Sequence, residues 1–404
     1  MPSGRNILRQ SGLPPFFRLA NPDRIGLAPP EPRLGEAVRL AARTLSGMQK
    51  EALVASARTG AVWRLASDEG AYLDGHDEAP CPLSFLSTGM AAATMNEIVV
   101  LAARRGIAIA NLRLIQDNFY TMRGSASEGT MTGGARDIAL EAQIDADASP
   151  DALRALVADA VVASPLDGLM REYKPSLFTL SHNGAEIETG RATPLGAPAL
   201  SDPADRFELA RIGRGDWSGL ISRMGRMTPK TDETRTFAGG SLTDRQDRLL
   251  HLRVFCTLRP DGLKEITQYM FNPHGAVFRF LSEEAPENGG QGRAPDAMTF
   301  AAAGIGFCFM TQFGRYARIM RKPIEQYRII QDAHFSLGGA SGGTGRRGEA
   351  APLETHVHIM SAESDDFARQ ALDMSEQTCF LHAFCKAALK TRIRLTRFDA
   401  ELAA

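Results

Sequence analysis

The sequence can be superposed on itself at one constant shift, the shift that carries Ala61 onto Ala276. Similar or identical residues meet at this repeat shift from the first quarter of each copy to its last, as in Ala61–Arg64 on Ala276–Arg279, Phe85 on Phe300, Gly89 on Gly304, Ile115–Asp117 on Ile330–Asp332 and Ser149 on Ser364. Two segments that keep register without a gap over this distance indicate a duplicated structural unit.

The two copies differ in their cysteines. At the repeat shift, Cys308 falls on Ala93, and Cys379 falls on Ser164. The second copy therefore carries a pair of thiols where the first copy has none. This asymmetry is the strongest functional signal in the sequence, and it places the chemistry in the second copy.

Length and composition are those of an ordinary protein with a hydrophobic core. The chain has 404 residues, 44% of them hydrophobic and 23% charged, and its formal net charge is −1. Such a balance provides no field that would attract nucleic acid or a membrane surface. Met1–Arg18 lacks the apolar run of a signal peptide, and the most apolar stretches, Met90–Ala103 and Phe300–Phe313, are shorter than the roughly 18 residues of a membrane span. We therefore expect a soluble, cytoplasmic protein.

Neither a metal nor a cofactor is expected. Five cysteines at irregular spacing match no disulfide framework and no standard zinc pattern. The Gly342–Gly345 run lacks the lysine and the following helix of a phosphate-binding loop.

The order of expected elements divides the chain into four parts. We predict an N-terminal arm at 1–32, a first unit at 33–190, a connector at 191–248 and a second unit at 249–404. Each unit is expected to contain a strand hairpin, a third strand, a long apolar helix, a further strand, a capped helix and a last strand. The expected helices are Ser84–Arg105, Ser149 to about Glu172, Ala297–Met320 and Ser364–Leu389.

The surroundings of the two cysteines resemble a known family. Cys308 lies in the Ala- and Gly-rich segment Phe300–Met310, and Cys379 follows in a later segment, Gln377–His382. This arrangement resembles the OsmC/Ohr family (osmotically inducible protein and organic hydroperoxide resistance protein). In the first copy, Pro82–Gly89 looks like the family's entry into its long helix, and Ser164–Leu166 looks like its Cys-Pro segment with sulfur replaced by oxygen.

The resemblance implies a fold and a chemistry. The fold would be α+β, with two tandem OsmC-like units forming an intramolecular pseudo-dimer whose antiparallel sheets wrap around long central helices. Cys308 would attack a small apolar peroxide as nucleophile, and Cys379 would resolve the sulfenic acid into a disulfide that an external dithiol reduces. The implied function is a thiol-dependent peroxidase with one site in each chain.

Two helpers of the family's peroxidatic cysteine are not matched in the sequence. The position of the family's Glu falls on Met298, with Leu83 in the other copy, and Asp296 is the closest acid. Arg259 and Arg279 are candidates for the family's Arg, although no motif assigns either. These departures favour an alternative function, a diverged non-catalytic small-molecule binding protein on the same fold. A scaffold that presents a surface to another protein is a third hypothesis.

Other candidate residues have simpler interpretations. Cys81, Cys256 and Cys385 are expected to be packing residues, and His382 a partly buried, hydrogen-bonded histidine. His356 and His358 alternate along a predicted strand without metal-ligand spacing. We expect structural salt bridges from Arg64 and Arg279, with Glu69 and Glu284 as their candidate partners.

Overall fold

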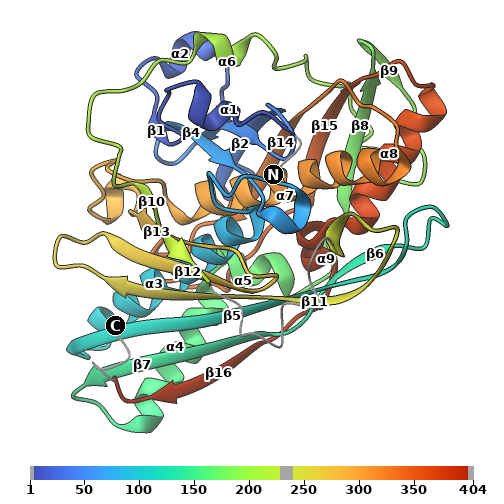
Figure 1. Ribbon diagram of the computed structural model, residues 1–404. Helices are drawn as coiled ribbons and strands as arrows, with labels where there is room; N and C mark the ends of the chain where they lie inside the picture. The colour runs from blue at the N-terminus through green and yellow to red at the C-terminus, as the bar shows by residue number, and fades with distance from the viewer. Residues whose placement is uncertain (1–3, 228–239, 399–404) are drawn as a thin grey trace.

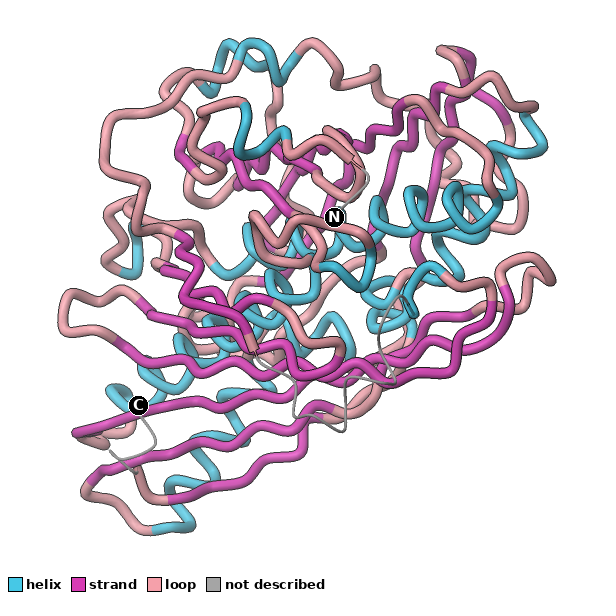
Figure 2. Tube along the Cα trace, in the orientation of Figure 1, coloured by secondary structure: helices cyan, strands magenta, loops and turns pink. Residues whose placement is uncertain are grey.

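The computed structural model describes residues 4–227 and 240–398, which form an α+β fold with two large, mainly antiparallel sheets. Figure 1 shows the two sheets with helices between them, and Figure 2 shows the same arrangement by secondary structure.

The first sheet has the strand order β1-β4-β3-β2-β14-β15-β8-β9. Its strands are β1 (Phe17–Arg18), β2 (Gly35–Thr44), β3 (Lys50–Ser56), β4 (Val62–Ser67), β8 (Ser176–His182), β9 (Ala185–Ile187), β14 (Gln326–Ser336) and β15 (Leu353–Met360). Within this sheet, β2 pairs with β14 from the other half of the chain, so neither half completes it alone.

The second sheet has the matching order β10-β13-β12-β11-β5-β7-β16, with β6 paired to β5. Its strands are β5 (Ile109–Ser125), β6 (Thr132–Ala135), β7 (Ile138–Ala146), β10 (Ile221–Arg226), β11 (Arg245–Leu258), β12 (Lys264–Asn272), β13 (Ala276–Ser282) and β16 (Thr391–Thr396). Here β11 pairs with β5, which again joins strands from the two halves.

The helices are of two kinds, long core helices and shorter ones that cover them. They are α1 (Ile7–Gln10), α2 (Pro22–Ile25), α3 (Pro82–Arg104), α4 (Pro150–Ala163), α5 (Pro165–Met170), α6 (Arg206–Leu209), α7 (Ala297–Met320), α8 (Asp365–Thr378) and α9 (Phe380–Lys386), with short 3-10 turns η1 (Ala71–Leu73), η2 (Gly240–Leu242) and η3 (Pro286–Asn288). The ends of the two long helices, α3 and α7, lie close to those predicted from the sequence.

The elements recur at the spacing seen in the sequence. The repeat shift carries the bounds of α4 onto those of α8, and it carries the bounds of η1 onto those of η3. The same shift relates α3 to α7, α5 to α9, and β2–β5 to β11–β14, with small displacements of the ends. The internal repeat of the sequence is therefore also a repeat of the structure.

The layers stack in the order sheet, α7, α3, sheet. Helix α7 packs on β2, β3 and β14 of the first sheet, and α3 packs on β5, β11 and β12 of the second. The two helices contact each other more extensively than any other helix pair, and both are almost wholly buried. Helix α8 then covers α7, and α4 covers α3.

Two glycines allow the central helices to approach each other. A Cβ atom on Gly89 of α3 would lie 2.5 Å from the carbonyl oxygen of Ala297, and one on Gly304 of α7 would lie 2.6 Å from the backbone nitrogen of Leu86. Real Cβ atoms do not approach backbone atoms this closely, so neither position accepts a side chain at the observed crossing. The two glycines are equivalent under the repeat shift.

Two predicted helices are wrong in one respect, because each is broken. The helix expected from Ser149 to Glu172 stops at Ala163 and resumes at Pro165, which lacks a backbone N–H and disfavours helical geometry at Ser164. The helix expected over Ser364–Leu389 is interrupted at Cys379 and ends at Lys386. No proline marks this second break. Cys379 therefore lies between two helices, not within one.

The segments outside the two repeats are packed against them. In the N-terminal arm, β1 pairs with β4, and Phe16 and Phe17 are buried. In the connector, β10 pairs with β13. Parts of both segments therefore extend the sheets instead of running free over the surface.

Helices α3 and α7 are long and apolar enough to cross a membrane by length and composition alone. In this fold, 83% and 94% of their most apolar windows are buried inside the protein, as in core helices. Their hydrophobicity is therefore accounted for by the core.

We predict that Gly304→Ala destabilises the protein although alanine is the better helix former. Alanine gains about 1 kcal/mol in an unconstrained helix, but the clash with α3 forces the helices apart and costs about 1–3 kcal/mol or more. Urea denaturation should show a lower midpoint for Gly304→Ala and for Gly89→Ala. Gly219→Ala is the control, because its Cβ meets no atom within 4 Å. Unchanged midpoints in both helix variants would contradict the close crossing.

Candidate functional site

A small cavity beside Cys308 lies where the two halves of the chain meet. Its volume is about 20 Å³, which is room for one or two water molecules. The first half contributes lining residues between Glu69 and Leu83, and the second half contributes the rest: Arg248, Leu250, Met270, Cys308, Thr311, Gln312, Arg315 and Phe380. The repeat thus builds one wall of the cavity from each copy.

The structure brings the two predicted site cysteines together. Cys308, in the middle of α7, and Cys379, between α8 and α9, lie close enough that Cys379 raises the pKa of the Cys308 thiol. Both cysteines are free and buried, with exposed fractions of 2% and 0%.

Short-range contacts fix the position of each sulfur. The break before α9 leaves its first backbone N–H groups free, and that of Leu381 lies close enough to Cys308 to lower the pKa of its thiol. The Cys379 sulfur accepts the N–H of His382 at 3.5 Å as the N-cap of α9. The interruption at Cys379, which the sequence did not predict, is therefore what aims two backbone donors at the thiol pair.

In this conformation Cys308 is a thiol. Burial raises its pKa well above the ordinary value, the neighbouring Cys379 raises it further, and the nearby charge of Glu69 adds a smaller increase. The N–H of Leu381 lowers the pKa, but by less than burial and Cys379 raise it. Ionisation of Cys308 therefore needs additional positive charge close to the sulfur.

Glu69 is a site residue that sequence reasoning missed. It follows β4 and accepts hydrogen bonds from the hydroxyls of Tyr72 at 2.8 Å and Thr311 at 3.0 Å. Thr311 lies one helical turn after Cys308, so Glu69 reaches the cavity from the other copy. Burial raises the pKa of Glu69, which lets it hold a proton closer to neutral pH than an exposed carboxyl does.

Arg64 and Arg279 form salt bridges as expected, but the expected partners Glu69 and Glu284 are wrong. Arg64 pairs with Glu51 at 2.7 Å and not with Glu69. Glu284 pairs with Lys264 at 2.5 Å, while Arg279 lies 4.0 Å from Glu265. Alternation along β4 and β13 directs these arginines to cross-strand neighbours instead of the loops that follow. With Arg64 paired elsewhere, Glu69 is available to the cavity.

Three cations surround the thiol pair, and none was predicted. Lys50 is 1% exposed and donates to the carbonyl of Met48 at 2.6 Å, and it attracts Glu69, Asp68 and Cys308. Arg248 and Arg315 both line the cavity. The proposed candidates Arg259 and Arg279 do not line it, and Arg259 pairs instead with Asp261 in the β11–β12 turn.

His382 differs from its prediction. It is fully buried, and neither ring nitrogen has a hydrogen-bond partner among the described residues. Its ring stacks on Phe309 at a centroid distance of 4.8 Å. Burial lowers the pKa of His382 to about 3, so the ring is neutral at neutral pH and does not stabilise a thiolate as an imidazolium.

The remaining cysteines are all buried. Cys81 lines the same cavity as Cys308, and its thiol contacts the hydroxyl of Ser84 at 3.2 Å. Burial raises the pKa of Cys81 to about 12. Cys256 and Cys385 are completely buried. Within residues 4–227 and 240–398, no group of three or more His, Cys, Asp or Glu side chains could hold a metal ion.

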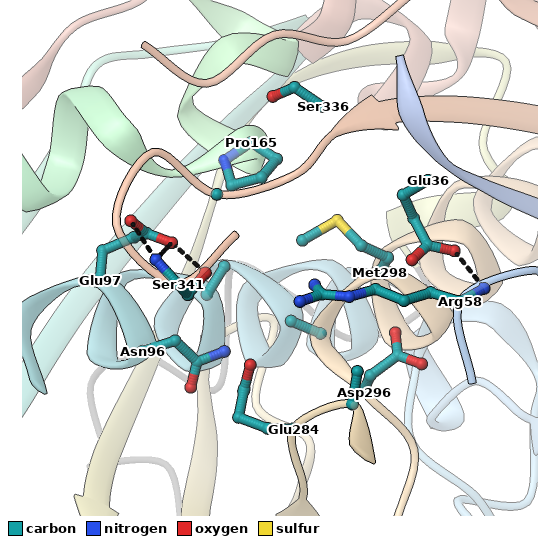
Figure 3. A pocket seen from close by; sticks show the side chains of 14 residues that line it. Glu36, Arg58, Asn96, Glu97, Pro165, Glu284, Asp296, Met298, Ser336 and Ser341 are labelled. Atoms are coloured by element: carbon teal, nitrogen blue, oxygen red, sulfur yellow. Dashed lines mark hydrogen bonds between the residues drawn. The ribbon is translucent and has the colours of Figure 1, made fainter. Parts of the chain in front are cut away.

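A second cavity occupies the equivalent place in the other half (Figure 3). It also has a volume of about 20 Å³. Under the repeat shift its lining residues replace those of the thiol cavity as follows: Ala93 for Cys308, Glu284 for Glu69, Asp296 for Cys81, Asn96 for Thr311, Glu97 for Gln312 and Pro165 for Phe380. Asp296, the acid nearest to Cys308 in the sequence, thus belongs to the cavity without thiols.

This second cavity is acidic. Glu36 and Asp296 both line it, and Figure 3 shows the side chain of Arg58 passing between them toward the middle of the cavity. Glu97 accepts the backbone N–H groups of Ala340 and Ser341 and so anchors the glycine-rich loop after β14. Burial and the nearby charge of Asp296 raise the pKa of Glu36 to about 8.

Comparisons with known proteins find one family match, and it lies in the thiol-bearing region. Residues 290–394 match the family model for OsmC-like proteins. Among solved structures, the chain is similar to an OsmC-like hydroperoxide resistance protein from Jannaschia sp. CCS1, with 19% sequence identity over 38% of this chain and 98% of that one, and a TM-score of 0.25. No curated protein matches the chain.

We predict that Glu36 makes stability fall as pH rises. Its folded-state pKa of about 8 exceeds the ordinary value of 4.5, so the folded protein holds this proton more tightly than the unfolded chain does. The resulting stabilisation is complete below pH 4.5 and is lost as pH rises through 8. Glu36→Gln, which stays neutral, should be more stable than wild type at pH 9 by about 2–4 kcal/mol and nearly equal to it at pH 4.5.

The measurement is urea denaturation of both proteins across this pH range. Glu325→Gln at an exposed position is the control for removing a carboxyl group. A difference between wild type and Glu36→Gln that does not change with pH would contradict the prediction.

Proposed function

Because residues 290–394 match the family model for OsmC-like proteins, we propose that this chain is a thiol-dependent redox protein that reduces organic hydroperoxides. Cys308 is the attacking thiol, and Cys379 is the resolving thiol. The observation that carries the proposal is the proximity of these two thiols, with Cys308 lining a cavity that also contains an acid and two arginines. A structural cysteine needs no such neighbours.

The proposed reaction proceeds in three balanced steps. The Cys308 thiolate attacks the distal peroxide oxygen, the O–O bond breaks, and the alkoxide takes a proton to leave as an alcohol. The resulting sulfenic acid condenses with the Cys379 thiol to give a disulfide and water. A dithiol reductant then transfers two electrons and restores both thiols, becoming a disulfide itself.

The surrounding residues support this sequence. Glu69, with its raised pKa, is placed to supply the proton that the alkoxide needs. Arg248 and Arg315 provide the positive charge that ionisation of Cys308 requires. The cavity volume suits the two oxygens of a hydroperoxide group, and Leu73, Leu83 and Phe380 offer apolar surface to its organic part.

The sheets suggest how one chain forms the site. We propose that the two repeats form an intramolecular pseudo-dimer, since each sheet combines strands of both repeats and the cavity draws on both. One repeat has kept the thiols, and the other serves as the partner wall. Five unoxidised cysteines suit the reducing interior of a cell, so we place the protein in the cytoplasm.

We predict that stoichiometric cumene hydroperoxide removes two thiols and forms a Cys308–Cys379 disulfide. Thiol titration with mass mapping of peptides measures both. Cys308→Ser should lose no thiols rapidly, whereas Cys379→Ser should stop at a sulfenic acid that dimedone traps. Cys256→Ser is the matched control, because Cys256 is buried on β11 and does not line the cavity. Thiols that stay reduced under excess peroxide would exclude the peroxidase and favour the binding-protein alternative.

We predict that oxidation of Cys308 speeds up steadily with pH. The raised pKa makes the thiolate a minor species at pH 7, and its fraction grows tenfold for each pH unit below the pKa. The second-order rate constant with cumene hydroperoxide should therefore rise between pH 6 and 9 without reaching a plateau. Stopped-flow measurements on wild type test this. A plateau below pH 8 would show that the arginines already hold Cys308 as a thiolate.

A further inference from the structure

The two arginines of the thiol cavity lack carboxylate partners. Neither Arg248 nor Arg315 forms an ion pair with a carboxylate of the described residues, although the protein pairs most of its other arginines in this way. A buried charge without a counter-ion is costly, because protein replaces water poorly around an ion.

Arg315 is the clearer case. It is 2% exposed, and its Nε donates to the carbonyl of Ser241 at 2.7 Å. The other nitrogens contact the amide oxygen of Gln312 at 3.4 Å and the sulfurs of Met122 and Met131 at 3.5 and 3.2 Å. Thioether sulfur is a weak acceptor, so these contacts do not balance a full positive charge.

Arg248 lies on the same cavity and adds to the imbalance. It donates to the hydroxyl of Ser241, and its Nε has no partner among the described residues. Arg248 also repels Arg315, and burial together with this repulsion lowers the pKa of Arg315 to about 9. Burial lowers the pKa of Arg248 to about 10. Both groups remain charged at neutral pH.

The acids nearby do not offset the cations. The charged residues that line the cavity are Glu69, Arg248 and Arg315. Two arginines against one carboxyl leave one positive charge in excess along this lining, even with Glu69 ionised. Burial raises the pKa of Glu69, which increases the excess when it is protonated, and Lys50 attracts Glu69 from behind.

From this excess charge, the unpaired guanidinium groups and the cavity they line, we infer that the thiol cavity binds one small monovalent anion of the halide class, with chloride as the common occupant. The cavity volume of about 20 Å³ admits an ion of that size and excludes the larger, doubly charged sulfate. The anion lies between Arg248 and Arg315 and supplies the missing negative charge. It leaves when Cys308 ionises, since the thiolate then provides that charge.

This anion site does not depend on the peroxide chemistry. The decisive experiment therefore uses Cys308→Ser, which has no thiolate to compete and cannot react with peroxide. Its thermal midpoint is measured in sodium chloride and in sodium gluconate at equal ionic strength. Binding of chloride to the folded state alone should raise the midpoint by at least about 2 °C, saturating with concentration.

Two variants of α7 make the test specific. Arg315→Met removes the charge with a side chain suited to its methionine neighbours, and it should abolish the chloride-dependent shift. Arg318→Met is the control from the same helix, because Arg318 already pairs with Asp74 at 2.8 Å, and it should keep the shift. Equal midpoints in chloride and gluconate, or a shift retained in Arg315→Met, would overturn the inference.

Direct detection covers the case in which Arg315→Met does not fold. The wild-type protein should broaden the ³⁵Cl resonance of sodium chloride, and bromide, an ion of nearly the same size, should sharpen it again by competition. A ³⁵Cl line width that bromide leaves unchanged would overturn the inference. Neither result bears on whether Cys308 reacts with hydroperoxide, so the anion site and the proposed function fail separately.

Discussion

The close crossing of α3 over α7 is the contact on which the other features depend. Gly89 and Gly304 bring the two backbones within a distance that no side chain would permit. The helices in turn fix the separation of the two sheets, because each packs on one of them. Cys308 lies one turn beyond Gly304 on α7, so the same crossing sets how near the thiol comes to the start of α3 and to Cys81.

Much of the fold follows from the sequence because the repeat appears twice in it. The apolar, proline-free stretches of both copies predicted α3 and α7 with nearly correct ends, and the N-cap serines predicted where α4 and α8 begin. The break at Cys379 could not be predicted in this way, since no proline or glycine marks it. It is imposed by tertiary packing, and only comparison with Ser164-Pro165 in the other copy would have indicated it.

The sequence predicted the cysteines of the candidate site but not its charged residues. The two cysteines stand out because the other copy lacks them. Glu69, Lys50, Arg248 and Arg315 do not stand out, because they come from segments far apart in the chain and meet only through strand exchange between the copies. Glu69 even has a matching acid, Glu284, at the equivalent position of the other copy, which made it look structural. Alternation within a strand cannot show which charges face a cavity formed by another part of the chain.

The two cavities show how one scaffold came to hold opposite electrostatics. The equivalent positions that carry Cys81 and Gln312 beside the thiols carry Asp296 and Glu97 beside Ala93. The cavity without thiols has an excess of acid, which Arg58 partly offsets and which keeps the pKa of Glu36 high. The cavity with thiols has an excess of cation. A site that must accept a negative charge needs an excess of positive charge. The negative charge is either that of the Cys308 thiolate or that of a bound anion. The cations therefore match the chemistry of the cavity beside which they lie.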